Sequence, residues 1–143
     1  MQAAQLQIDC NDYLDATEIA FTARSLPADS PAELKFSLLI DASALTIPPS
    51  GDGSRQLNLD VAVCTYNEKL WPLKLMNYPV NIKMSSQQLN TLMSTGKLAD
   101  TIRVPGPKPS AVRLLVKDVA SGRLGSIYIR TDGLPAKYPA ASD

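Results

Sequence analysis

The chain has 143 residues and a mass of 15.4 kDa, with 45% hydrophobic residues and fourteen basic residues balancing fourteen acidic ones. This length and composition are typical of one folded domain and argue against disorder along the whole chain. A net charge of zero gives no global field that would attract nucleic acid, and no apolar run is long enough for a membrane-spanning helix, so neither nucleic acid nor membrane insertion is expected.

The two ends of the chain carry little pattern. The first residues lack the basic start and apolar centre of a signal peptide, so the chain is expected to be either cytoplasmic or a piece of a longer exported protein. Residues 1–16 are expected to form an extension or an edge strand, and residues 136–143 a loose tail. Residues 1–33 hold six acidic and one basic residue, whereas residues 97–130 hold seven basic and two acidic ones. We expect solvated surface here, with two alternatives: neighbouring terminal strands that compensate each other, or charged faces that a partner reads.

Apolar and polar residues alternate along short stretches that are separated by proline- and glycine-rich turns, which indicates a succession of strands. The exception is the stretch from about 85 to 95, where apolar residues recur at helical spacing between a serine cap and Gly96. Seven to eight strands and one short helix predict an all-β antiparallel sandwich over residues 17–135. The expected strands are, in chain order, 17–25, 33–41, 55–66, 70–75, 79–84, 101–104 and the two arms of a closing hairpin within 112–130.

The closing hairpin has the clearest alternation. Val112, Leu114 and Val116 are expected to face the core, with Arg113 and Lys117 on the opposite, polar face.

The turn of this hairpin has its own residue signals. Asp118 is expected to accept hydrogen bonds from the turn backbone, Gly122 to take a positive φ, and Gly125 to permit a bulge or close packing. These roles are structural and involve no chemistry.

The chain contains no histidine, which removes the serine–histidine and cysteine–histidine catalytic systems and the commonest metal ligand. Its two cysteines, Cys10 and Cys64, have no zinc-site spacing and no context that would activate a thiolate. Cys64 is out of phase with the apolar residues of its strand, so it is expected to point away from the face that they bury. A Cys10–Cys64 disulfide and two separate free thiols both remain open.

Aspartates at strand ends are the other candidates for chemistry. Asp41, Asp60 and Asp118 could converge as a carboxylate-based hydrolase, but residues of this type more often accept hydrogen bonds within turns. Asp41 with Ser43, and Asp52 in a glycine–serine loop, resemble cation loops only loosely because the ordered oxygen ligands are incomplete. No enzyme activity, metal or other cofactor is therefore expected.

Aromatic residues are sparse, and they do not alternate with basic residues as a platform for single-stranded nucleic acid would. Trp71 beside Pro72, with Tyr66 and Tyr78 nearby in sequence, could form an exposed patch that binds a sugar or a peptide. A lone tryptophan in such a fold is more often buried filler. A carbohydrate-binding module would require Trp71 and one tyrosine to be exposed and roughly coplanar.

The stretch from Val116 to Ser126 (Val-Lys-Asp-Val-Ala-Ser-Gly-Arg-Leu-Gly-Ser), preceded by a Pro-Gly-Pro turn, resembles the closing motif of the C-terminal domain in von Willebrand factor type A-related proteins of the acidobacterial type. Further matches are Asp41–Thr46 before a glycine-rich loop, the strand Leu57–Val63 and the helical stretch Ser85–Gly96. The resemblance follows the order of elements over residues 17–135. It implies an immunoglobulin-like sandwich in a longer secreted, periplasmic or cell-surface bacterial protein, and it implies no catalytic residues.

The expected function is therefore that of a non-catalytic module for protein–protein contact or spacing. Its contact surface would be sheet faces and the end loops 47–54, 66–78 and 105–110. A carbohydrate-binding module and a carboxylate-based hydrolase are the alternatives.

Overall fold

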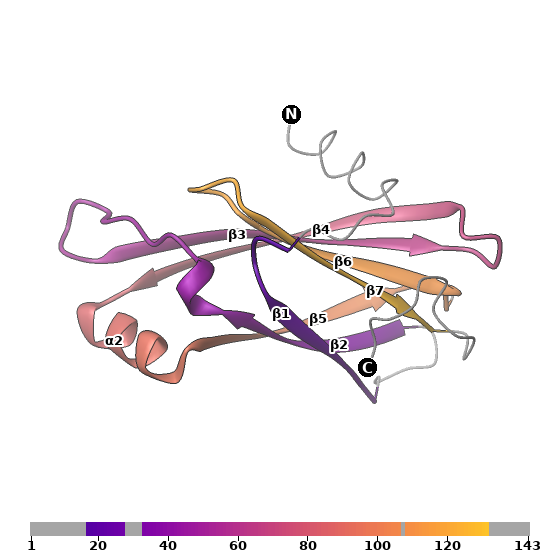
Figure 1. Ribbon diagram of the computed structural model, residues 1–143, viewed down its shortest axis with the longest axis horizontal. Coiled ribbons are helices and arrows are strands. Elements are labelled where there is room, and N and C mark those ends of the chain that lie inside the picture. The colour runs from indigo at the N-terminus through magenta and orange to yellow at the C-terminus, as the bar shows by residue number, and fades with distance from the viewer. Residues whose placement is uncertain (1–16, 28–32, 107, 132–143) are drawn as a thin grey trace.

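The structure is a computed structural model that describes residues 17–27, 33–106 and 108–131 (Figure 1). These residues form seven antiparallel strands, one short 3₁₀ turn and one α-helix, as the alternating pattern predicts. The elements are β1 (Phe21–Leu26), β2 (Glu33–Asp41), η1 (Ala42–Ala44), β3 (Arg55–Tyr66), β4 (Pro72–Met84), α2 (Ser86–Thr95), β5 (Lys97–Pro105), β6 (Ala111–Asp118) and β7 (Leu124–Arg130). The expected flanking segments 1–16 and 136–143 lie outside the described residues.

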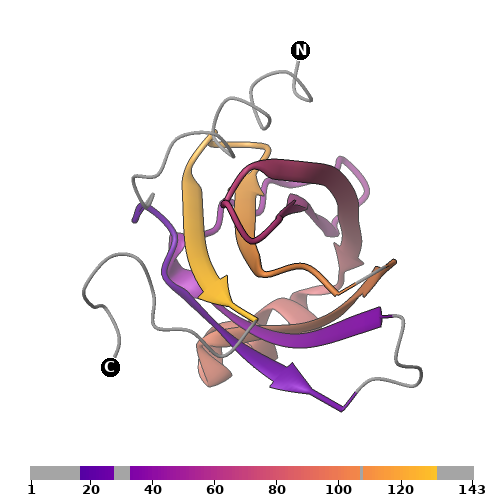
Figure 2. The ribbon, with the colours of Figure 1, turned by 90° about the vertical axis from the view of Figure 1, so that its right-hand side faces the viewer.

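The strands form two sheets that face each other across one core (Figures 1 and 2). One sheet has the order β1-β2-β5 and the other has the order β4-β3-β6-β7. If β1, β2, β3, β5, β6 and β7 are read as the immunoglobulin strands A, B, C, E, F and G, the pairings B–E and C–F are both present. The fourth strand pairs with β3 instead of β5, so the connectivity is immunoglobulin-like with this strand moved to the other sheet.

The core lies between the sheets and is built from every second residue of the strands. Leu57, Leu59, Val61 and Val63 of β3 are completely or almost completely buried there, opposite Phe36 of β2. Burial of such side chains contributes about 1.5–3 kcal/mol each. The core-facing residues of β6 are Val112, Leu114 and Val116, as expected.

One continuous strand, β4, replaces the two strands expected at 70–75 and 79–84. It pairs with β3 from Pro72 to Met84 and runs through Pro79, which lies opposite Asp60. Proline lacks a backbone N–H, but β4 is the edge strand of its sheet, so no second partner needs that donor. The expectation treated Pro79 as the start of a strand because the sequence does not reveal which strands are at an edge.

The helix α2 occupies the residues that its caps predict. Ser85 and Gln88 form a reciprocal capping box, and Gly96 ends the helix with φ 79°. Leu92 is the buried contact of the helix with the core, and Leu89 packs beside it. The strand that follows, β5, starts directly after Gly96 and spans nine residues, so the expected strand at 101–104 is only its second half.

The first strand is shorter than expected. Thr17 pairs with Gly125 of β7 in an isolated bridge, and regular pairing with β2 begins at Phe21. The described start of the chain therefore lies beside β7, which agrees with one of the alternatives, that of neighbouring terminal strands.

The hairpin of β6 and β7 differs from its expected pattern in one respect. Arg113 points away from the core but is only 1% exposed, whereas a polar, solvated face was expected. It stacks on the ring of Tyr128, with the guanidinium carbon 5.3 Å from the ring centroid. Alternation predicted the direction of this side chain correctly, but it could not indicate that the second face of the sheet is also buried.

Candidate functional site

The three aromatic residues expected to form a binding patch are separated in the structure. Trp71 is 66% exposed, whereas Tyr66 is 1% exposed and packs with Tyr128 on the outer face of the β3–β6 sheet. Tyr78 is half-buried against the core, and its hydroxyl donates a 2.7 Å hydrogen bond to the carbonyl oxygen of Arg103. Of the three, only Trp71 is therefore placed to contact a partner with most of its surface.

A compact turn holds Trp71 outward. The side-chain oxygen of Asn67 accepts hydrogen bonds from the backbone N–H groups of Lys69 (2.9 Å) and Trp71 (3.0 Å). Leu70 has φ 62°, a left-handed conformation that costs a non-glycine residue roughly 1–2 kcal/mol. Its side chain is buried, which offsets that cost and turns the next residue, Trp71, toward solvent.

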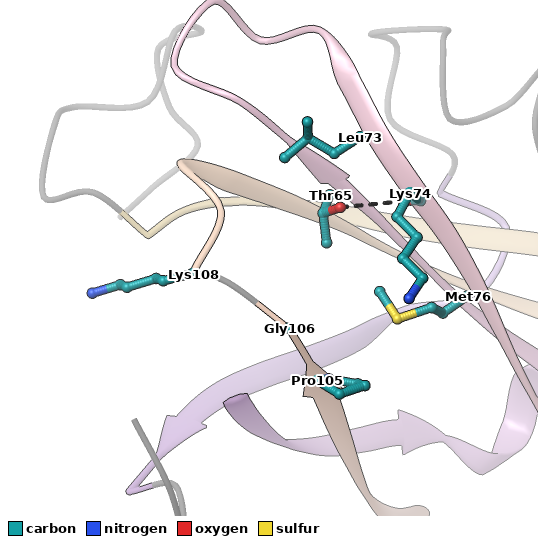
Figure 3. A pocket seen from close by; sticks show the side chains of 7 residues that line it. All are labelled: Thr65, Leu73, Lys74, Met76, Pro105, Gly106 and Lys108. Carbon is teal, nitrogen blue, oxygen red and sulfur yellow. Dashed lines mark hydrogen bonds between the residues drawn. The ribbon is translucent and has the colours of Figure 1, made fainter. Parts of the chain in front are cut away.

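A pocket of about 260 Å³ opens at the same end of the sandwich (Figure 3). Its lining comes from three separate parts of the chain: Thr65 of β3, the first half of β4, and the end of β5 with the residues that follow it. The lining residues are Thr65, Leu73, Lys74, Met76, Pro105, Gly106 and Lys108.

The pocket lies beyond a contact between β4 and β5. The hydroxyl of Tyr78 on β4 reaches the backbone of Arg103 on β5, and the lining residues Met76 and Pro105 each lie two residues farther toward the open end. A register shift between β3 and β4 follows at Thr65, whose hydroxyl donates to the carbonyl oxygen of Lys74. The core therefore ends in a hollow that is apolar on one side and open to solvent on the other.

The charged groups of the pocket are cationic. Lys74 and Lys108 contribute its charged side chains, and no carboxylate is among its lining residues. Figure 3 shows the Lys74 ammonium directed toward Met76, whereas Lys108 points away from the hollow. Leu73, two residues after Trp71 in the chain, is also well exposed and extends the apolar surface out of the pocket. We call Trp71, Leu73, Lys74, Met76 and Pro105 the open-end surface.

Residues 66–78 and 105–110, two of the three loops expected to form contact surface, both contribute to the pocket. The third, 47–54, precedes the first residue of β3, at the opposite end of that strand from Thr65. The sequence did not predict that Lys74, Met76 and Pro105 line one pocket, because nothing in it indicates that β4 meets the end of β5.

The candidate carboxylates have local partners. Asp41 accepts hydrogen bonds from the hydroxyl (2.9 Å) and the backbone N–H (3.1 Å) of Ser43, which lower the pKa of its carboxyl. Asp118 accepts from the hydroxyl of Ser121 at 2.7 Å and from the backbone N–H of Thr46 at 2.9 Å. Asp60 is largely buried on the outer face of β3, away from the core. None of the three lines the open-end pocket or a second pocket of about 220 Å³ beside Ile19.

In both loops that resemble cation sites, the aspartate already interacts with protein groups: Ser43 contacts Asp41, as described above, and a lysine and two serines contact Asp52. Asp52 is paired with Lys83 and accepts hydrogen bonds from Ser50 and Ser54, and these contacts, Lys83 first, hold the pKa of its carboxyl far below its ordinary value. No cluster of three or more potential metal ligands occurs among the described residues.

The turn residues of the closing hairpin have separable roles. Gly122 has φ 79° with open space around it, so its backbone conformation is what favours glycine. At Gly125 a Cβ atom would overlap the carbonyl oxygen of Ile19, so close packing is what favours glycine there. The Asp118 carboxylate accepts hydrogen bonds from the hydroxyl of Ser121 in the turn and from the distant backbone N–H of Thr46. The expected role of Asp118 was confined to the turn and did not include the bond from Thr46.

Cys64 lies on the outer face of β3, as its phase predicts, and it is disulfide-bonded. Of the two alternatives left open by the sequence, a free thiol at Cys64 is therefore wrong, and Cys10 lies outside the described residues.

The fold defines the class of this protein as an all-β sandwich domain with immunoglobulin-like connectivity. The chain matches no protein-family model, and no curated protein is similar to it in sequence. Over the described part of the chain, no helix has the length and apolar character needed to span a membrane.

Proposed function

We propose that this chain is a non-catalytic β-sandwich module of a secreted or cell-surface bacterial protein, and that the open-end surface binds a protein partner. The observation that carries the proposal is a hollow that is lined by exposed Leu73 and by Lys74, whose ammonium is directed toward Met76, with exposed Trp71 two residues before Leu73 in the chain. Large exposed apolar side chains next to a concave site are typical of binding surfaces.

The lining favours a peptide segment that has one large apolar side chain flanked by carboxylates. The apolar side chain would fill the space between Met76 and Pro105, and a carboxylate would pair with Lys74. The absence of acidic residues from the lining supports this choice, because electrostatic complementarity governs specificity at such surfaces.

A carbohydrate ligand is supported less well. Sugar rings stack on exposed aromatic faces, and among the described aromatic residues only Trp71 is mainly exposed. A carboxylate-based hydrolase also has little support, since Asp41 and Asp118 already accept local hydrogen bonds and neither lies in a described pocket.

The exported setting has two sources of support. The closing hairpin resembles the C-terminal domain of von Willebrand factor type A-related proteins, which would place this chain in a longer precursor. A disulfide at Cys64 suits an oxidising compartment.

The test is a titration followed by nuclear magnetic resonance. The probes are three short ligands: a peptide with one leucine between aspartates, the same peptide with lysines in place of the aspartates, and cellohexaose. The expected result is that the acidic peptide shifts the amide signals of Thr65, Met76 and Gly106 and that the basic peptide does not. Shifts around Trp71 with cellohexaose alone would overturn the proposal in favour of a carbohydrate-binding module.

Two variants and a control sharpen this test. Lys74→Glu should reverse the preference between the two peptides, and Trp71→Ala should weaken binding of the acidic peptide without unfolding the domain. Leu39 on the other sheet is also an exposed large apolar residue, so Leu39→Ala is the matched control and should leave binding unchanged. Equal effects of Trp71→Ala and Leu39→Ala would contradict a specific site.

A further inference from the structure

The outer face of the four-stranded sheet, which points away from the core, is apolar and buried. A second hydrophobic cluster lies there, separate from the core between the sheets, and its central members are at most 1% exposed. They are Ala62, Cys64, Tyr66, Ala111 and Leu115. Leu70, Leu75, Leu124 and Tyr128 border this cluster.

None of the described strands or helices supplies a layer over this outer cluster. The second sheet lies on the opposite face, across the main core, and α2 contacts β4, β5 and η1. An apolar sheet face that is this buried needs a covering segment. Without one, its side chains would contact water and the free energy gained by burying them would be lost.

The covalent chemistry of the face points to its occupant. Cys64 at the centre of the cluster is disulfide-bonded, and the chain contains one other cysteine, Cys10. We propose that the segment 1–16 docks on the outer face of the β3–β6–β7 sheet and is fastened there by a Cys10–Cys64 disulfide.

The reach of the chain fits this proposal. Thr17 pairs with Gly125 of β7, whose partner along the sheet is Val116 of β6 and then Val61 of β3. Cys64 therefore lies three strand spacings across and three residues along from Thr17, a distance of roughly 17 Å for strands ~4.8 Å apart with a rise of ~3.3 Å per residue. Cys10 precedes Thr17 by seven residues. Seven extended residues span up to about 23 Å, so the connection needs no change in the sheet.

Charge complementarity supports the same occupant. Arg113 is buried on this face next to Tyr128, and a buried guanidinium is stable only where carboxylates or other acceptors reach it. The segment 1–16 carries Asp9, Asp12 and Asp15 and no basic side chain. Docking through Cys10 would bring these carboxylates over the face that holds Arg113.

Peptide mapping without reduction tests the disulfide. Trypsin releases Cys10 in the peptide 1–24 and Cys64 in the peptide 56–69. The expected product is these two peptides joined, from a protein that migrates as a monomer on a non-reducing gel. Free thiols on both cysteines, or a disulfide-linked dimer, would overturn the proposal.

Hydroxyl-radical labelling tests the docking. Tyr66 and Tyr128 on the outer face should be protected in the intact oxidised protein and should become several-fold more reactive in a variant that lacks residues 1–15. Tyr78, which packs against the core, is the internal control and should not change. If the truncated variant does not fold, the full-length Cys10→Ser variant and the reduced wild type provide the same comparison. Unchanged labelling of Tyr66 in a folded truncated variant would show that another segment covers the face. Tyr66 pairs with Pro72 at the edge of the open-end surface, but the labelling is measured without peptide. Peptide binding in the preceding titration can therefore fail without affecting this result.

Discussion

The carboxylate of Asp118 accepts a 2.9 Å hydrogen bond from the backbone N–H of Thr46, a residue 72 positions earlier in the chain. The bond joins the closing hairpin to the connection between β2 and β3, and it is formed where Asp118 is completely buried. The same carboxylate oxygen accepts from the hydroxyl of Ser121 in the hairpin turn. One side chain therefore fixes a local turn and a long-range contact together.

Asp118→Ala should lower the free energy of unfolding by about 2 kcal/mol, because a hydrogen bond to a charged group is lost and the Thr46 N–H keeps no acceptor. Urea denaturation measures the change. Ser121→Ala is the matched control: it leaves the bond to Thr46 in place, removes the local donor to Asp118 and the acceptor of the Arg123 N–H, and should cost about 1 kcal/mol. Equal losses in both variants would mean that the bond to Thr46 contributes nothing.

The two glycines of the hairpin should respond differently to alanine. Gly122→Ala should cost about 1 kcal/mol, because alanine would have to adopt a left-handed conformation; the space around the new Cβ is free and adds no further cost. Gly125→Ala should cost about 2 kcal/mol or more, because its Cβ meets the backbone of Ile19. Hydrogen exchange separates the causes. In Gly125→Ala alone, the Glu18 amide, which donates to the Leu124 carbonyl, should lose protection. Protected Glu18 in that variant would contradict this mechanism.

Burial raises the pKa of the Tyr78 hydroxyl, which also donates to the Arg103 carbonyl. The folded state therefore favours the protonated phenol. Its stabilising contribution is complete below about pH 10, the ordinary value for tyrosine, and is lost as the pH rises through the higher pKa of the folded state. The difference in unfolding free energy between wild type and Tyr78→Phe should accordingly shrink above pH 10. A difference that grows with pH would contradict this assignment.

The pKa of the exposed Asp52 carboxyl is held well below its ordinary value by Lys83 and by hydrogen bonds from Ser54 and Ser50. Its contribution to the order of the 50–54 loop is present above about pH 4 and is lost as the pH falls toward the lowered pKa. Carboxyl carbon shifts measure this titration directly. Lys83→Met should raise the pKa of Asp52, and high salt should raise it in the wild type but not in the variant. A salt response of equal size in both proteins would exclude the ion pair as the main cause.

Removal of the disulfide should be the most destabilising of these changes. With Cys10 as the partner of Cys64, a loop of more than fifty residues is closed, and Cys10→Ser should lower the free energy of unfolding by about 2–4 kcal/mol. Reduction of the wild type by a thiol should produce the same loss, measured by urea denaturation with and without reductant. Cys10→Ser is the control, because its free energy of unfolding should be the same with and without reductant.

Several elements follow from local sequence. The strands at 33–41 and 55–66 and the helix that ends before Gly96 have their expected bounds, because side-chain alternation and capping act between near neighbours in the chain. The outward direction of Cys64 and Arg113 also follows from alternation. In the candidate site, Trp71 and the loops 66–78 and 105–110 could be selected from sequence, since large aromatic residues and turn residues mark them.

The tertiary structure decided which of these residues meet. Pro79 continues a strand because β4 is at a sheet edge, and Arg113 and Tyr66 are buried because the second face of the sheet is not open to solvent. Lys74 of β4 and Pro105 of β5 line one pocket although their strands belong to different sheets. The sequence by itself determined the number, type and facing of most elements through local periodicity. The open-end surface and the buried outer face depend on contacts between residues far apart in the chain, which periodicity does not encode.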